Sequence, residues 1–176
     1  MSPEHSSSTR RLHLLRHAKS SWKQQGLSDR ERPLNERGRS TAKQLAKHLR
    51  RAGIRPQAVL VSPAVRTQET FERIRKGMPD DYEHWTEERL YGAGVEELIA
   101  VVAELPTGLT EVMLIGHNPG IGAFAGELAG PGAAADQLRR KFPTGALATI
   151  EVGCEWARLR PAATKLRDFV RPKDLT

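Results

Sequence analysis

The chain of 176 residues has almost no cysteine: Cys154 is the only one. An internal disulfide is therefore impossible, and a single thiol is typical of a reducing compartment. The sequence also lacks a run of about eighteen apolar residues, which a membrane-spanning helix needs. Its first residues, MSPEHSSSTRR, have no apolar stretch of the kind found in secretory signals. We therefore expect a cytoplasmic protein without a membrane partner.

Length and composition indicate one domain. Hydrophobic residues make up 38% of the chain and charged residues 28%, which is ordinary for a globular protein. No linker or internal repeat divides the sequence. We predict a disordered tail at residues 1–10, one domain at 11–176 and a monomer.

Positive charge is in excess, with a formal net charge of +7. Residues 30–55 hold nine Lys or Arg against two Glu. Nucleic acid is a common partner for such a surface, but no aromatic residues alternate with these charges as a single-strand binder requires. A phosphorylated substrate accounts for part of the same excess. We therefore expect a phosphorylated partner rather than nucleic acid.

Apolar spacing and capping residues predict alternating strands and helices. Asn35 and Gly53 enclose one helix, and Ser62 with Pro63 predicts the start of another that reaches about Lys76. The other expected helices are 95–105 and 121–128. The expected strands are 12–15, 58–62, 112–116 and 145–153, and the last of these is expected to pair with 155–160. Irregular segments are expected at 78–94, at 130–136 and in a solvated basic tail from 165, which Phe169 and Val170 dock onto the domain. This alternation indicates an α/β fold with a mainly parallel sheet.

Three of these strands end in residues that can hold a phosphate. Arg16 and His17 follow the first strand, Arg66 follows the second, and His117 with Asn118 follows the third. Ligands of open α/β sheets bind beyond the carboxyl ends of the strands. If the three strands are neighbours, two arginines and two histidines meet over one spot, close to a helix start that also favours an anion.

These residue types are suited to phosphoryl transfer. Guanidinium groups match the charge on the oxygens of a transferring phosphoryl group. A neutral imidazole can attack phosphorus, and nearby arginine charges lower its pKa. The histidines show no HExxH motif or Cys/His cluster. We predict that His17 attacks, that His117 helps to hold the group, and that no metal or other cofactor takes part.

The motifs LLRHAKS, SPAVRTQET and LIGHNPG together resemble the histidine phosphatase superfamily, the relatives of phosphoglycerate mutase. The RHAKS and GHNP forms are similar to its SixA-type phosphohistidine phosphatases, and RPLNERG before the first helix fits as well. The resemblance covers about Leu12 to Trp156. It implies a mixed sheet with helices on both faces, in the manner of phosphoglycerate mutase.

The resemblance also implies roles for individual residues. His17 is the nucleophile that becomes phosphorylated, and the phosphoryl group is bound by Arg16, Arg66 and His117. Asn118 is included as a phosphate ligand, although it can equally shape the turn before Pro119. In the motif EERLYG, Glu88 corresponds to the general acid of the mutases, with Glu87 or Asp29 as alternatives.

The loop after His17 differs from that of the mutases. Ala18, Lys19 and Lys23 replace the glycine, glutamate and asparagine found there, so contacts to a sugar phosphate are not carried over. We assign Lys19, Ser20 and Lys23 to a substrate loop, with capping of the loop as the simpler role for Ser20. A phosphohistidine on a protein is the expected substrate. The alternatives are a small-molecule phosphomonoesterase and an inactive phosphate-binding adaptor.

Overall fold

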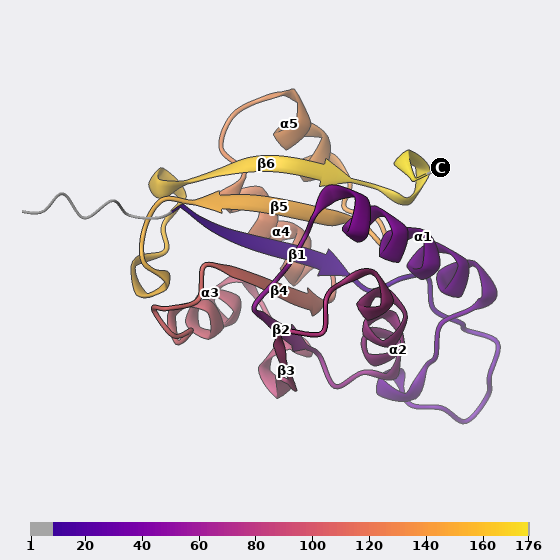
Figure 1. Cartoon of the computed structure of the whole chain (residues 1–176). Helices are drawn as coiled ribbons and strands as arrows, with labels where there is room; N and C mark the ends of the chain where they lie inside the picture. Colours follow the sequence, from indigo (N-terminus) through magenta and orange to yellow (C-terminus); the bar gives the residue numbers. More distant parts are fainter. Residues whose placement is uncertain (1–8, 176) are drawn as a thin grey trace, which may run out of the picture.

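A six-stranded sheet runs through the centre of the molecule (Figure 1). The computed structural model describes residues 9–175. The strands lie in the order β3-β2-β4-β1-β5-β6, with β3, β2, β4 and β1 parallel and β5 antiparallel to both of its neighbours. Their bounds are β1 Arg10–Arg16, β2 Ala58–Val61, β3 Glu83–Thr86, β4 Glu111–Gly116, β5 Leu147–Val152 and β6 Thr164–Val170. The predicted mixed, mainly parallel sheet is confirmed.

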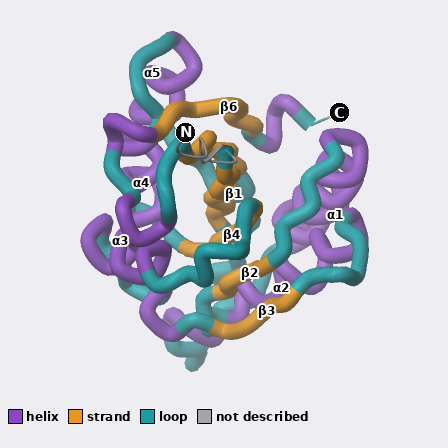
Figure 2. Tube along the Cα trace, turned by 60° about the vertical axis from the view of Figure 1, so that its left-hand side comes forward, coloured by secondary structure: helices purple, strands orange, loops and turns teal. Residues whose placement is uncertain are grey.

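Helices cover both faces of the sheet (Figure 2). α1 (Glu36–Ala52) and α2 (Val65–Ile74) lie on one face, and α3 (Val95–Ala103), α4 (Gly120–Leu128) and α5 (Ala133–Arg140) on the other. Side chains alternate along β1, so that Leu12 and Leu14 pack toward α3–α5 whereas Leu15 packs toward α1 and α2. The sheet therefore has a separate apolar core on each face. Among the described residues, no helix combines the length and apolar character that crossing a membrane requires.

Helix α1 begins and ends where its capping residues predict. The side-chain oxygen of Asn35 accepts a hydrogen bond from the Gly38 amide, and Gly53 ends the helix with a φ of 66°. Gly38 is also a point of close approach, because a Cβ there would collide with the carbonyl oxygen of Lys19. The start of α1 therefore packs directly on the loop that follows His17.

Helix α2 begins two residues later than predicted. Ala64, not Ser62, occupies the N-cap position, and the helix ends at Ile74. Ser62 instead continues the sheet, since its amide donates to the carbonyl oxygen of Ile115 at 3.1 Å. The Ser62 hydroxyl therefore lies at the carboxyl end of the sheet, within reach of a side chain at the end of the neighbouring strand β4.

Four other predictions of local structure were wrong. Residues 155–160 do not form a strand, because Trp156 is fully buried and its indole nitrogen donates to Leu109. The strand paired with β5 is β6, which lies in the segment predicted to be a solvated tail. The predicted loop at 130–136 contains the start of α5, and the irregular segment 78–94 contains β3.

The domain begins earlier than predicted, because Arg10 of the predicted tail (residues 1–10) belongs to it. Arg10 is the first residue of β1, it is buried, and its guanidinium donates to the carbonyl oxygens of Cys154 and Thr107. The domain therefore includes Arg10. Residues 1–8 of the predicted tail lie outside the described residues.

Candidate active site

The carboxyl ends of β1, β2 and β4 meet at one edge of the sheet. β4 lies between the other two, with Gly116 opposite Arg16 and Ile115 opposite Val61. The amide of His17 donates to the carbonyl oxygen of Gly116 at 3.1 Å, so the residue after β1 is held against the end of β4. The three strand ends are thus neighbours, as their polar residues predicted.

His17 is held as a neutral imidazole with one free nitrogen. Its Nδ1 lies 2.7 Å from the carbonyl oxygen of Ala18, which only accepts hydrogen bonds, so the ring proton is on Nδ1. Burial, as the largest cause, and the neighbouring His117, Arg66 and Arg16 together lower the pKa of His17 to about 3, against the opposing effect of the Ala18 bond. The lone pair of Nε2 is therefore available at neutral pH.

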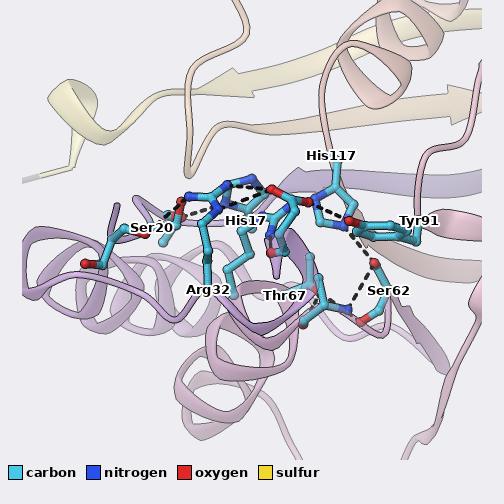
Figure 3. Close-up of polar contacts among 12 residues, drawn as sticks. His17, Ser20, Arg32, Ser62, Thr67, Tyr91 and His117 are labelled. Atoms are coloured by element: carbon cyan, nitrogen blue, oxygen red, sulfur yellow. Dashed lines mark hydrogen bonds and ion pairs between the residues drawn. The ribbon is translucent and has the colours of Figure 1, made fainter. Parts of the chain in front are cut away.

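His117 faces His17 from the end of β4, and the two ring centroids are 5.2 Å apart (Figure 3). Its Nε2 shares a 2.7 Å hydrogen bond with the hydroxyl of Ser62, and its buried Nδ1 has no partner within residues 9–175. Burial lowers the pKa of His117 to about 4, with Arg66 as the next cause. Tyr91 packs edge-on against the ring at 5.5 Å. His17 and His117, which with Arg16 and Arg66 form the cluster at this edge of the sheet, are thus both uncharged near pH 7.

We expect neither histidine to titrate near neutral pH in the folded protein. Because both pKa values lie below the reference of about 6.5, the rings of His17 and His117 should keep constant NMR shifts from pH 8 down to about pH 5. In urea, where burial is lost, all ring signals should titrate near the reference value. A folded-state transition of either ring near pH 6.5 would contradict this. Since the unfolded chain takes up these protons first, stability should fall as pH decreases below about 6.5.

Two guanidinium groups approach the same spot. Arg66, in the first turn of α2, is buried, and Arg16 ends β1 with its Nη1 donating to the carbonyl oxygen of Phe142 at 3.0 Å. Burial and the charge of Arg66 lower the pKa of Arg16. The Nε atoms of both arginines are buried without a partner in the described chain. Like charges with unused donors point to an anion as the missing partner.

Asp29 occupies part of this anion site. Its backbone oxygen and one carboxylate oxygen accept from the two Nη atoms of Arg66, at 2.6 and 3.0 Å. The hydroxyl of Tyr91 donates to the same carboxylate at 2.6 Å, and Arg32 binds its other oxygen. These bonds, that from Tyr91 first, lower the pKa of Asp29 well below its usual range. Both Nη atoms of Arg66 are therefore bound by Asp29, and its Nε is not.

Four residues that bind one another or a site residue here were not predicted to do so. Asp29 was considered only as an alternative acid, Ser62 only as a helix cap, and Arg32 and Tyr91 had no role. Arg32 begins the motif RPLNERG and Tyr91 lies in EERLYG, so both were inside sequences already singled out. Spacing alone did not indicate that these two motifs meet at Asp29.

Glu88 and Glu87 lie outside the cluster. The Glu88 side chain is 69% exposed and bonds the Nη2 of Arg30 at 2.9 Å. Arg30 in turn lies over the ring of Tyr91, which places Glu88 at the rim of the site. Glu87 accepts from the amide and guanidinium of Arg89. Neither carboxylate contacts His17 or His117.

Asn118 and Ser20 make hydrogen bonds that shape the site, whereas the two lysines of the predicted substrate loop do not. Asn118 donates to the carbonyl oxygen of Phe142 and accepts from the amide of Gly122, as expected of a residue that shapes the turn. Ser20 is buried and accepts from Arg32 at 2.8 Å. Lys19 and Lys23 are exposed and free to meet a substrate.

Known proteins match this chain over most of its length. The family model of the histidine phosphatase superfamily (branch 1) matches residues 12–118. Protein Rv1276c of Mycobacterium tuberculosis is 32% identical over 163 residues, which cover 90% of this chain and 100% of the relative. SixA from Nakamurella multipartitia is 30% identical with a TM-score of 0.82, covering 94% of this chain and 97% of that one. The protein histidine phosphatase SixA complexed with tungstate, at 22% identity, shares the fold with a TM-score of 0.76 over 94% and 99% of the two chains.

The chain therefore belongs to the histidine phosphatase superfamily, and it is a hydrolase of that superfamily, a phosphatase. Within the superfamily it is similar to the SixA proteins in fold and in sequence. The resemblance carried by LLRHAKS, SPAVRTQET and LIGHNPG is thereby confirmed.

Proposed function

We propose that the chain is a metal-independent phosphohistidine phosphatase of the cytoplasm, which removes the phosphoryl group from a histidine of another protein. The observation that carries this proposal is the state of His17. Its Nδ1 proton is fixed by Ala18, its Nε2 is unprotonated, and Arg16, Arg66 and His117 surround it. This combination supplies a nucleophile and the positive charge that phosphoryl transfer requires.

The reaction has two steps. In the first, the lone pair of His17 Nε2 bonds to phosphorus while the phosphorus–nitrogen bond of the substrate breaks, and the departing imidazole takes a proton from an acid. In the second, water attacks phosphorus and the electron pair of the enzyme's phosphorus–nitrogen bond returns to Nε2. Inorganic phosphate leaves, the proton lost by water restores the acid, and His17 is neutral again with its proton on Nδ1.

Arg16, Arg66 and His117 bind the oxygens of the phosphoryl group in this proposal. The two guanidinium groups neutralise charge that spreads over these oxygens as the bonds change. For both Nη atoms of Arg66 to do so, Asp29 must give way to phosphoryl oxygens, because its backbone oxygen now accepts from Nη1 and its carboxylate from Nη2. Asn118 contributes by holding the turn after His117, since its amide donates to Phe142 and accepts from Gly122.

Glu88 is the carboxylate best suited to supply the proton. The carboxylate of Glu87 is bound by the amide and guanidinium of Arg89, and that of Asp29 by Tyr91, Arg66 and Arg32, so neither is free to reach a leaving group. Glu88 stands at the rim, where a leaving group that points out of the site meets it. We therefore keep Glu88 as the general acid for leaving groups that need one.

Glu88→Gln should slow the hydrolysis of an alkyl phosphate by about 10²-fold, because an alkoxide leaves only with a proton. A phosphohistidine should be hydrolysed within about threefold of the normal rate, since an imidazole is a far better leaving group. Steady-state kcat for both substrates tests this, with Glu96→Gln on the exposed side of α3 as the control. Equal losses for the two substrates would contradict the assignment.

The protein histidine phosphatase SixA of the same fold was solved in complex with tungstate, an oxyanion that resembles phosphate, and this supports phosphate as the kind of ligand proposed here. A protein substrate is supported by the open surroundings of the loop after His17, where Lys19 and Lys23 are exposed. Phosphate release from a phosphohistidine protein and from an aryl phosphate, both with EDTA present, tests the proposal. We expect release that survives EDTA, requires His17 and favours the phosphohistidine protein. Preference for the aryl phosphate would instead indicate a small-molecule phosphomonoesterase.

A further inference from the structure

A cleft with a basic lining lies beside the active site. It has a volume of about 650 Å³ and opens between the loop after His17, the first turns of α1, the end of α5 and the turn that follows β6. β6 ends at the same edge of the sheet as β1 (Figure 1), which brings the end of the chain to this place. Seven lysines or arginines line the cleft, and the lining contains neither Asp nor Glu. We call it the basic cleft; its cations are Arg16, Lys19, Arg37, Arg140 and Lys141, with Arg171 and Lys173.

The basic cleft is joined to the active site through Gly145, which packs behind two of its lining residues, and through Arg16. Gly145, at a φ of 76°, donates its amide to the carbonyl oxygens of Arg16 and His17. A Cβ at this position would press on Thr41 of α1 and Pro172 after β6, both lining residues, at 2.9 and 3.1 Å. Arg16 lines the cleft and also faces His17. A ligand whose phosphoryl group lies at His17 therefore has the cleft next to it.

The positive charges of the basic cleft are hardly compensated. Within residues 9–175, only Arg171 of these seven has a carboxylate within 4 Å, that of Asp174 at 2.9 Å. By comparison, Arg73, Arg75 and Arg89 elsewhere on the surface each pair with a glutamate. Concentrated charge of one sign attracts a ligand of the opposite sign and speeds its association. The cleft is thus suited to an anionic ligand with several charges.

The lining also indicates the kind of anion. No aromatic residue is present, so a nucleobase would find nothing to stack on. Arg37, Arg140, Lys141 and Lys173 are exposed, long side chains that come from separate elements, and they suit charges spaced along an extended chain. We propose that the basic cleft binds an acidic segment of the substrate protein, adjacent in space to the phosphohistidine. This inference rests on the proposed function and adds the feature by which a substrate protein is selected.

Peptide binding tests the basic cleft without any phosphoryl chemistry. The probes are a short fluorescein-labelled peptide with histidine flanked by glutamates, and the same peptide with every glutamate replaced by glutamine. We expect the wild-type protein to bind the glutamate peptide at least about tenfold more tightly in fluorescence anisotropy, and this difference to shrink in high salt. Equal affinity for the two peptides would overturn the proposal.

Matched charge variants locate the binding. Arg140→Gln with Lys141→Gln should weaken binding of the glutamate peptide by about 5- to 10-fold. Lys43→Gln with Lys47→Gln removes the same charge from the exposed side of α1, outside the cleft, and should cost less than about twofold. Equal losses in both variants would reduce the effect to net charge and overturn the assignment to the cleft. Circular dichroism establishes that both variants are folded.

Further measurements distinguish the cleft proposal from the proposed function and from nucleic-acid binding. If a phosphohistidine peptide is not hydrolysed but the glutamate peptide still binds at Arg140 and Lys141, the proposed function fails while the cleft assignment stands. With turnover present, the Arg140→Gln and Lys141→Gln variant should raise KM for the glutamate-flanked phosphohistidine peptide and not for the glutamine-flanked one. Tighter binding of a labelled oligonucleotide than of the glutamate peptide would replace the acidic segment with nucleic acid.

Discussion

Replacement of His17 by alanine should reduce kcat by about 10⁴-fold or more on every substrate, because the atom that bonds to phosphorus is removed. No other group at the site can replace it. His117 has one ring nitrogen bound to Ser62 and the other buried. Phosphate release in a purified preparation, with EDTA present, measures the effect.

The cause of this loss can be separated from misfolding. His84→Ala removes a histidine from the exposed strand β3, away from the cluster, and should keep full activity. Thermal melts should show that the His17→Ala variant unfolds cooperatively. Wild-type protein mixed with substrate and quenched in alkali should carry a phosphoryl group on His17, and the variant should carry none. Substantial turnover by the variant, or a phosphoryl group on another residue, would contradict the mechanism.

Arg16, His17 and His117 were predictable because they stand at the ends of predictable strands. Leu12–Leu15, Val59–Val61 and Val112–Ile115 are apolar runs, and neighbouring parallel strands bring their carboxyl ends together. Arg66 lies five residues beyond Val61, in the first turn of α2, and was therefore also brought to this edge of the sheet. The two ends of α1 were predicted for a similar reason, since Asn35 and Gly53 act within one turn of chain.

Other parts of the fold depend on contacts that carry no periodic signal. β6 was missed because a bulge lies within it: Leu166 and Phe169 both pack on the core, although they are three residues apart. β3 has four exposed residues and shows no apolar pattern. The network around Asp29 joins residues 29, 32, 66 and 91, which reach one another only through loops. Its geometry therefore required the structure.

Arg66→Ala should lower kcat by about 10²–10³-fold, equivalent to about 2.7–4 kcal/mol of lost transition-state stabilisation. Arg66 is 5% exposed, so its charge acts on the phosphoryl group with little screening by water. The loss should fall mainly on kcat, since the demand for positive charge is greatest while the bonds to phosphorus change. Arg66→Lys keeps the charge without the planar fork and should recover only part of the rate.

The Asp29 carboxylate bears on how the Arg66→Ala result is interpreted. In the free enzyme this carboxylate occupies Arg66, so it competes with the phosphoryl group that Arg66 must bind. Arg73→Ala, which removes an intrahelical pair from the same helix, controls for lost charge and helix stability and should keep activity within about twofold. An Arg66→Ala defect confined to KM would mean that Arg66 binds substrate and transition state equally. Its contribution to phosphoryl transfer would then come from placement alone, and Arg16 with His117 would have to supply the charge stabilisation.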